Sequence, residues 1–411
     1  MDTSSSHGEP KGLSHQAVEN KFAGISTAEN FSKYAVFDDL AYPDEILEKK
    51  RHSGASEQAP SDSAAAIYMR SLLNSRDHIF EATLRVTKIQ FNRLAQWLRD
   101  HTGFEDSKRW TCAQRLMVAL YIMGSGETQR NAARRFHMNQ RCVDRIFSEV
   151  LSHLAKLHLA FVQMPGDTYV SDKINNDDTY SAFNGCIGAI DCAHVATHVP
   201  LAKRRRFRSP QGGITQKVLA AVAFDGRFVY VLAGGEGSLR DAAFLRIASG
   251  MRLNIPKGRF FVANTGFGIA RRGIVCPFAN TRYRVEEFAE RGLQPKSPEE
   301  LYNLTHSSLQ VIVEKAFDMM TRRWGILRTC PPEYSLTHRI RLIYVATALH
   351  NFVLMDGLEP KDYIQRGEES LSPSEKMMRK DSLARADENV DEKTGKQLRD
   401  EIAKAFGENY A

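Results

Sequence analysis

Two carboxylates lie in apolar surroundings that make them candidates for chemistry. Asp191 lies inside the run CIGAIDCAHV, where a charge is costly unless it is paired or binds a metal ion. Glu314 lies beside Val311 and Phe317, at the border of an apolar helical stripe. Two-metal cleavage of phosphodiesters needs several carboxylates that converge on divalent cations. The alternatives are a paired core aspartate and an ordinary exposed helix residue, and sequence spacing does not decide between them.

A zinc site is a second possibility in the same run. Cys192, His194 and His198 fall on the same parity of an extended strand, so their side chains could face one way. No fourth ligand follows nearby. The six cysteines form no CxxC pair, which argues against a zinc ribbon and against a disulfide framework.

The elements around these residues indicate a mixed α/β domain. The run CIGAIDCAHV reads as a buried strand, and KVLAAVAF and FVYVLA read as two strands joined by a hairpin at Asp225-Gly226. A helix capped near Ser238 and closed by Gly250 follows, then a fourth strand, RFFVAN, that ends at Asn264. A late helix over THSSLQVIVEKAFDMMTRRW carries Glu314.

Residues 63–165 have helical periodicity throughout, with breaks at residues 101–103 and 124–126. Within them, residues 129–136 and a second helix through Val143 and Val150 form a helix-turn-helix-like pair. Such a pair is also common in plain helical packing, but its basic residues favour DNA. The predicted DNA contacts here are Arg134, Arg135, Arg141 and Arg145, with Arg130 beside them.

Charge and composition favour a nucleic-acid partner. The chain of 411 residues has a formal net charge of +7, which favours a polyanion. The basic run Lys203, Arg204, Arg205, Arg206, Phe207, Arg208 reads as a nuclear localisation signal, a phosphate-contacting loop or a solvated turn. Residues 1–62 and 366–411 are polar or charge-dense, so we expect a disordered N-terminal tail and a charged C-terminal tail whose end forms a helix through Ile402 and Phe406. No signal peptide or membrane span is expected.

Residues 188–352 resemble the nuclease domain of PIF/Harbinger-type DDE transposases. The matching pieces, in the family's order, are AIDCAHV, VLAAVAFDGRFVYVLAGGEGSLRDAAFL, PKGRFFVANTGF, RYRVEEF, ELYNLTHSSLQVIVEKAFDMMTRRWGIL and ALHNFV. The resemblance implies an RNase H-like mixed sheet with flanking helices over residues 184–353. It also implies Mg²⁺ or Mn²⁺ as cofactor, DNA as substrate, a nuclear location and a separate Myb/SANT-like partner protein.

Carried over by position, the resemblance implies catalytic and metal-binding roles for Asp191, Asp241 and Glu314. The chain departs from the family at Asn264, because the family pattern V-D-A-G-Y reads Ala263-Asn264-Thr265-Gly266-Phe267 here. An asparagine removes one negative charge from a site that must hold two divalent cations. The sequence therefore predicts either a DDE endonuclease-like enzyme with a weakened ligand at Asn264 or a non-catalytic protein that binds DNA, chromatin or other proteins.

Overall fold

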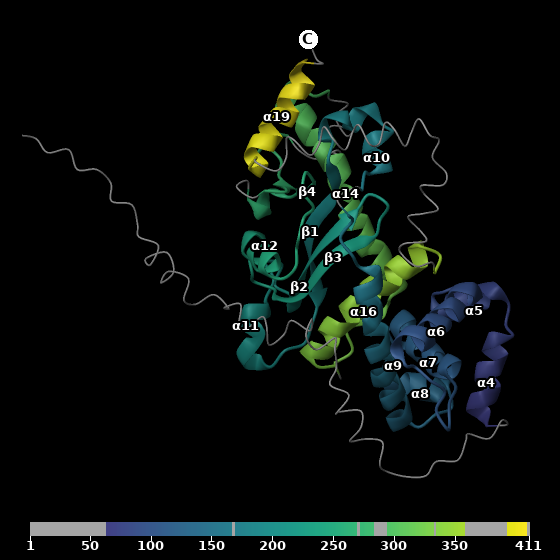
Figure 1. The fold of residues 1–411 in the computed structure, drawn as a ribbon. Coiled ribbons are helices and arrows are strands. Elements are labelled where there is room, and N and C mark those ends of the chain that lie inside the picture. The colour runs from purple at the N-terminus through teal and green to yellow at the C-terminus, as the bar shows by residue number, and fades with distance from the viewer. Residues whose placement is uncertain are drawn as a thin grey trace, which may run out of the picture.

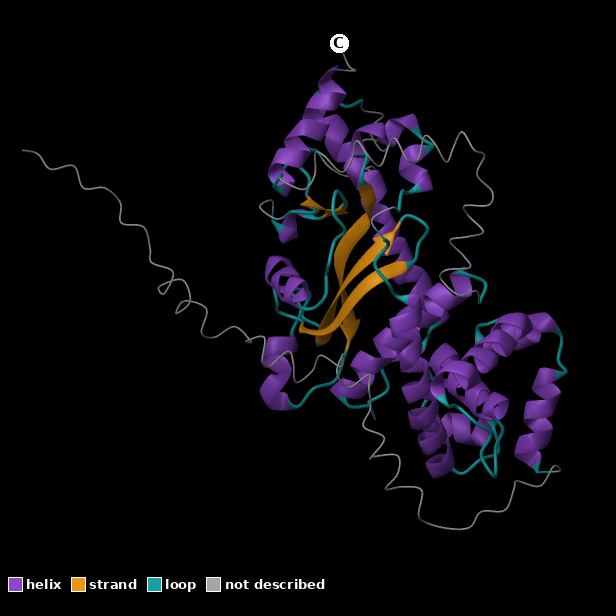
Figure 2. Cartoon of the chain, viewed as in Figure 1, coloured by secondary structure: helices purple, strands orange, loops and turns teal. Residues whose placement is uncertain are grey.

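The computed structural model of the protein describes residues 63–166, 169–268, 272–282, 294–332, 334–357 and 393–408. A five-stranded sheet lies at its centre, with helices on both faces and a group of helices from the N-terminal part beside it (Figure 1). Figure 2 shows that all strands belong to this one sheet in the drawn part of the chain. The predicted N-terminal tail, residues 1–62, lies outside the described residues. No helix of the described residues is long and apolar enough to cross a membrane.

The sheet has the order β3-β2-β1-β4-β5. The first three strands are antiparallel, whereas β4 pairs in parallel with β1 and β5 pairs in parallel with β4. The predicted hairpin at Asp225-Gly226 is confirmed: Gly226 has φ 88°, a value that favours glycine. The strands are β1 (Cys186–Ala196), β2 (Thr215–Ala223), β3 (Phe228–Glu236), β4 (Phe260–Ala263) and β5 (Ile274–Val275).

The N-terminal part is helical, as predicted, up to α9. Its breaks fall where the sequence indicates them, because α6 and α7 both end in glycines with left-handed backbone, Gly103 and Gly126. The helices are α4 (Ala64–Leu73), α5 (Asp77–Leu84), α6 (Lys88–Thr102), α7 (Cys112–Ser125), α8 (Gln129–Arg135) and α9 (Gln140–Phe161). The next elements are α10 (Asp172–Asn175) and the 3₁₀ helix η1 (Asp178–Phe183).

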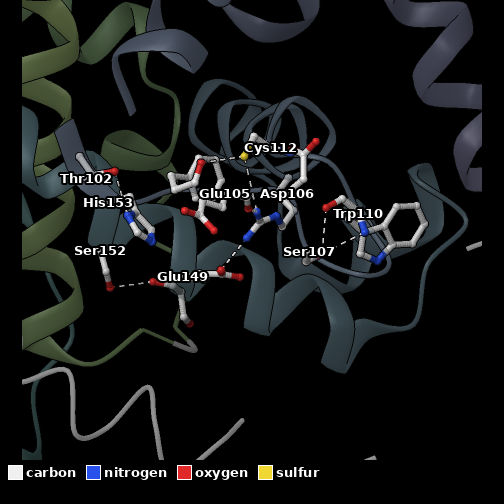
Figure 3. Close-up of polar contacts among 12 residues, drawn as sticks. Thr102, Glu105, Asp106, Ser107, Trp110, Cys112, Glu149, Ser152 and His153 are labelled. Carbon is white, nitrogen blue, oxygen red and sulfur yellow. Dashed lines mark hydrogen bonds and ion pairs between the residues drawn. The ribbon is translucent and has the colours of Figure 1, made fainter. Parts of the chain in front are cut away.

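A buried arginine fixes the segment between α6 and α7 against α9. Figure 3 labels its partners Glu105 and Glu149. Arg115 is only 3% exposed, and its guanidinium donates to Glu149 Oε1 at 2.5 Å and to the carbonyl of Glu105. The Cys112 amide donates to Asp106 Oδ1 at 2.7 Å in the same cluster. Charge-assisted bonds of this kind are stronger than neutral ones. They hold an irregular segment in place at the base of the helical part.

The helices of the sheet domain cover its two faces with separate hydrophobic clusters. On one face, α14 and α16 share a cluster with Ala189 of β1 and Val218 of β2, and this cluster continues into the N-terminal helices through α9. On the other face, Phe244 and Leu245 of α12 pack against Ile190. These helices are α11 (Arg204–Phe207), α12 (Asp241–Gly250), α14 (Pro298–Arg323), α15 (Ile326–Thr329) and α16 (Leu336–Leu354), with 3₁₀ helices η2 (Leu201–Lys203) and η3 (Thr265–Phe267).

The last helix of the chain, α19 (Gly395–Glu408), packs on this domain. It contacts α14, β5 and η1, and Ile402 is only 4% exposed. The Phe406 ring lies 6.1 Å from the Phe183 ring. The predicted helix through Ile402 and Phe406 is therefore present, and it contributes to the core of the sheet domain. Residues 366–392 of the predicted tail lie outside the described residues.

Three details of the sheet domain differ from the expectations. Helix α12 begins at Asp241 after Arg240, without a side-chain cap, because the Ser238 hydroxyl donates to the Arg206 carbonyl at 2.8 Å. The predicted cap at Ser238 is therefore wrong. Helix α14 begins at Pro298, earlier than predicted, with Ser297 as its cap. The two-residue strand β5 is too short to leave a pattern in the sequence.

Candidate functional site

Asp191 and Asn264 meet because their strands run in parallel. Ile190 of β1 is in register with Ala263, the last residue of β4. The next residues along the two strands, Asp191 and Asn264, are therefore neighbours. Asn264 Nδ2 donates to Asp191 Oδ2 at 2.8 Å. The amide nitrogen must face Asp191, because an ionised carboxylate only accepts hydrogen bonds. The side chain at the fourth-strand position is therefore used as a donor to the first aspartate.

Glu314 approaches the same face of the sheet from α14. Gln310, one turn earlier on this helix, donates from Nε2 to the Ile190 carbonyl at 3.1 Å and so fixes α14 over the strand that carries Asp191. By strand alternation Asp191 faces the side of Ala189, which is the α14 side. The Glu314 residue is exposed, and its charge contributes to the raised pKa of Asp191. Asp191, Asn264 and Glu314 therefore belong to one face.

Asp241 belongs to the other face, where it pairs with a lysine that the sequence analysis did not single out. Lys217 of β2 has the parity of Leu219, whose cluster contains α12. Its ammonium donates to Asp241 Oδ1 at 2.6 Å and to the Leu239 carbonyl at 2.5 Å. A Cβ added at Gly266 would lie 2.8 Å from Asp241 Oδ2, so this carboxylate is also pressed against η3. Asp241 thus approaches Asp191 from the α12 side of the sheet, and Lys217 neutralises its negative charge.

Burial dominates the electrostatics of Asp191. It raises the pKa of this carboxyl to about 6, against the hydrogen bonds from the Cys192 amide and Asn264, which lower it. The negative charges of Asp241 and Glu314 raise the pKa further. Asp191 is ionised above this pH at a cost in folding free energy, because its charged form is only partly compensated.

Asp191→Asn is therefore expected to stabilise the protein at alkaline pH. The folded-state pKa lies above the usual value, so the folded protein binds the proton more tightly between about pH 4 and pH 6, and stability falls as pH rises through that window. At pH 8 the variant should gain up to about 3 kcal/mol, the free-energy equivalent of the raised pKa. At pH 4 the gain should vanish.

Urea unfolding in EDTA buffer at both pH values measures this difference. The exposed Asp178→Asn variant serves as the control, since its side chain is not buried. An Asp191→Asn variant that loses stability at pH 8 would show that the ionised carboxylate is well compensated.

The residues present do not fit the pair of divalent cations that the resemblance implies. Asn264 presents a donor to Asp191, and the ammonium of Lys217 already holds Asp241. One acceptor is left over, because Gln310 Oε1 is buried with no hydrogen-bond donor in the described part of the chain. Nor do any three His, Cys, Asp or Glu residues within the described ranges form a group that could hold a metal ion. Two carboxylates and a neutral oxygen leave most of the charge of two divalent cations uncompensated.

The zinc alternative gains no support from the described residues, for the same reason. His194 Nδ1 lies 2.8 Å from Thr215 Oγ1 and so has a hydrogen-bond partner on β2. Burial raises the pKa of the Cys192 thiol well above its ordinary value, so the thiolate that zinc requires is disfavoured.

The basic run from Lys203 to Arg208 forms η2 and α11. Arg206 pairs with Glu236, and Arg208 Nη1 donates to the Gly212 carbonyl at 3.1 Å. Arg204 and Arg205 are exposed, with no ion pair to another described residue. The Ser238 amide and hydroxyl both donate to the Arg206 carbonyl, which joins this run to the loop before Asp241.

The arginines of the helix-turn-helix-like pair are on the surface. Arg134 and Arg145 are exposed, as are Arg130 and Arg141, whereas Arg135 donates from Nε to the Tyr68 hydroxyl at 2.8 Å. Helix α8 packs on α9 and α7. Helices α8 and α9 occupy this stretch, and the helix-turn-helix-like pair with its role in DNA binding stays a prediction.

Family models match both parts of the chain, but only the model for the sheet domain describes an activity. Residues 190–351 match the family model of the DDE superfamily endonuclease, and residues 60–156 match a domain of unknown function. The chain is 25% identical over 304 residues to "Protein ALP1-like" of Arabidopsis thaliana, a match that covers 67% of this chain and 70% of the relative. It is 23% identical over 276 residues to "Putative nuclease HARBI1" of Homo sapiens, covering 65% and 74%. No solved structure matches the chain.

Proposed function

Residues 190–351 form a DDE superfamily endonuclease domain of the kind found in Harbinger-type, transposase-derived nucleases, and from this premise we propose that the chain binds DNA without cleaving it at an appreciable rate. The observation that carries the proposal is the hydrogen bond from Asn264 Nδ2 to Asp191 Oδ2. DDE superfamily endonucleases generally depend on divalent metal ions. Here the position that would supply a second metal-binding carboxylate supplies an amide donor instead.

The strand order supports an RNase H-like reading of this domain. Three antiparallel strands are followed by β4 and β5, which pair in parallel on the far side of β1. This order places the end of β4 beside the middle of β1, which is where Asn264 and Asp191 lie. We therefore take the acidic cluster, which consists of Asp191, Asp241 and Glu314 together with Asn264, as the former catalytic centre of a nuclease. Its remaining carboxylates on the α14 face are Asp191 and Glu314.

Two exposed basic surfaces support DNA binding. The first contains Arg204 and Arg205, which are joined through Ser238 to the edge of the sheet domain. The second is the helix-turn-helix-like pair, with Arg134, Arg141 and Arg145. These arginines have no ion pair with another described residue, so they are available to neutralise phosphates and release counterions. The net charge of +7 acts in the same direction.

A nuclear location follows from the same proposal. A DNA-binding protein with the run KRRRFR has a segment of the composition that nuclear import recognises, and Arg204 and Arg205 are accessible in the folded chain. A separate Myb/SANT-like partner, which the family resemblance implies, would supply sequence recognition that a phosphate-binding surface lacks.

DNA binding is tested with the unaltered chain and the double variant Arg204→Ala/Arg205→Ala on a labelled duplex, at several salt concentrations. The unaltered chain should bind with a salt-dependent affinity. The double variant should bind more weakly, and its slope of log affinity against log salt should fall by about 2, because two phosphate contacts are lost.

Arg206→Ala is the matched control, because Arg206 belongs to the same run but is already paired with Glu236. Its slope of log affinity against log salt should fall by less than about 1, the change expected for the loss of one phosphate contact. The same samples, incubated with supercoiled plasmid and Mg²⁺ or Mn²⁺, should give no nicking. Salt-independent binding, or rapid metal-dependent nicking by the unaltered chain, would refute the proposal.

A further inference from the structure

A pocket lies where the turn between α8 and α9 meets the start of α16, away from the acidic cluster. Its volume is about 760 Å³, within the range of small-molecule sites. Helices α9 and α16 are in extensive contact and lie side by side in Figure 1. The pocket is lined by Gln129, Asn139, Gln140, Arg141, Asp144, Tyr334, Ser335 and His338. None of these belongs to the acidic cluster.

Two long helices begin at this pocket. Asn139 caps α9, a helix of 22 residues, and accepts from the Arg141 amide at 2.9 Å. Ser335 caps α16, a helix of 19 residues, and accepts from the His338 amide at 3.3 Å. Both caps line the pocket. The positive ends of two helix dipoles therefore point at one space, which favours an anion there.

Two polar groups of the pocket lack partners, and they are independent of the helix ends. Gln129 is only 7% exposed, and its side-chain amide has no hydrogen bond to any described residue. His338 Nε2 is buried with no hydrogen bond in the described part of the chain. The His338 ring stacks on Tyr334 with centroids 5.5 Å apart. A side chain such as Gln129, nine-tenths buried and without a hydrogen bond to a described residue, can gain one from a ligand in the pocket that it lines.

The hydrogen-bond donors of the lining, together with the two helix N-termini, indicate the sign of that ligand. Arg141 is exposed and has no ion pair among the described residues. Among the described residues of the lining, Asp144 is the one opposing charge, and it is also exposed. The Gln129 amide, the Ser335 hydroxyl and the Arg141 guanidinium all offer N–H or O–H donors. All three of these donors can bind an oxygen-rich anion.

We propose that this pocket binds the phosphate group of a nucleotide. The space exceeds what a phosphate alone fills, and the remaining room, beside the stacked Tyr334 and His338 rings, is open to the rest of the nucleotide. Asp144 provides an acceptor for its amino or hydroxyl groups. A nucleotide within a DNA strand and a free nucleotide share this chemistry. The inference rests on the proposed DNA binding only for the first of these sources.

Titration calorimetry of the full chain with inorganic phosphate and with thymidine 5′-monophosphate tests the site. Gln129→Glu replaces the unpaired amide by a carboxylate of the same shape, and Arg141→Gln removes the exposed cation. Each variant should weaken binding of both probes by about tenfold or more, the usual effect of losing a charge-assisted hydrogen bond. Lys108→Gln is the matched control. It removes an exposed cation of the helical part that lies outside the lining, and should change binding less than twofold.

Thermal unfolding of each variant shows whether it is folded, and Arg141→Gln, at an exposed position, keeps the test valid if Gln129→Glu fails to fold. A 20-base-pair duplex that displaces thymidine monophosphate identifies the strand as the source of phosphate, and a duplex that leaves it bound identifies the free nucleotide. Absence of binding at millimolar concentrations of both probes, or equal affinity in all variants, would overturn the inference. DNA binding without phosphate binding rejects this pocket alone, whereas phosphate binding without DNA binding rejects the proposed function alone.

Discussion

Asn264→Asp is expected to raise the affinity of the chain for Mn²⁺ by at least about tenfold, equivalent to roughly 1.4 kcal/mol. In the unaltered protein the Asn264 amide donates to Asp191 at 2.8 Å. The variant replaces that donor by a third carboxylate on the α14 face, beside Asp191 and Glu314. Carboxylates crowded in a partly buried site repel one another at reduced dielectric, and a divalent cation relieves this repulsion.

Titration calorimetry with Mn²⁺ measures the gain, and plasmid nicking is measured separately on the same protein. Asn264→Ala is the matched control, because it removes the hydrogen bond to Asp191 without adding charge, and it should gain no affinity. Tighter Mn²⁺ binding without nicking would show that the parts that position DNA for cleavage are lost as well. Nicking by the unaltered chain as fast as by the Asn264→Asp variant would remove Asn264 from the catalytic shell and contradict the proposed function.

The neighbourhood of Asp191 and Asn264 could be predicted from the sequence because strand pairing alone determines it. Asn264 follows the last residue of β4, and the parallel pairing of β4 with β1, with Ala263 in register with Ile190, places it beside Asp191 in the middle of β1. The approach of Glu314 could be predicted from helical periodicity, since it lies beside Val311 and Phe317 at the border of the stripe that α14 turns toward the sheet.

The place of Asp241 could not be predicted, because it depends on side-chain parity and on a residue from another strand. The resemblance grouped Asp241 with Asp191, whereas the structure has its carboxylate paired with Lys217 on the α12 side. One signal was present in the sequence. Lys217 is the only charged residue of β2, a strand whose other residues from Gln216 onward are buried, and a buried lysine calls for an acidic partner.

The pocket between α9 and α16 could not be predicted from the sequence, because it too depends on residues that are distant in the chain. Gln129 and His338 lie in different parts of the chain, and nothing in either segment indicates that they share a space. Arg141 was predicted to contact DNA from its place in a basic helical pair. The structure adds that it lies at a built pocket, while Arg145 on the same helix does not. Long-range packing of the helical part on the sheet domain creates this difference.

Breaking the Lys217–Asp241 pair is expected to give the largest losses of stability, and the two single variants should differ. Asp241→Asn leaves an ammonium whose side chain is only 7% exposed without its counter-charge, and removal of one partner of a buried pair typically costs about 3–5 kcal/mol. Lys217→Met leaves a carboxylate that is 29% exposed and partly solvated. Its cost should be smaller, about 1–3 kcal/mol.

Urea unfolding of both single variants and of the double variant measures the coupling between the two residues. The double variant should be more stable than the sum of the single losses predicts, because neither charge is then left buried alone. The same variants decide the role of Asp241 when they are made together with Asn264→Asp, where Mn²⁺ binding is measurable. If Asp241 serves the fold alone, Lys217→Met and Asp241→Asn lower stability and leave Mn²⁺ affinity within about twofold. If Lys217→Met instead raises Mn²⁺ affinity tenfold and Asp241→Asn lowers it, Asp241 is a metal ligand that Lys217 neutralises in the unaltered chain.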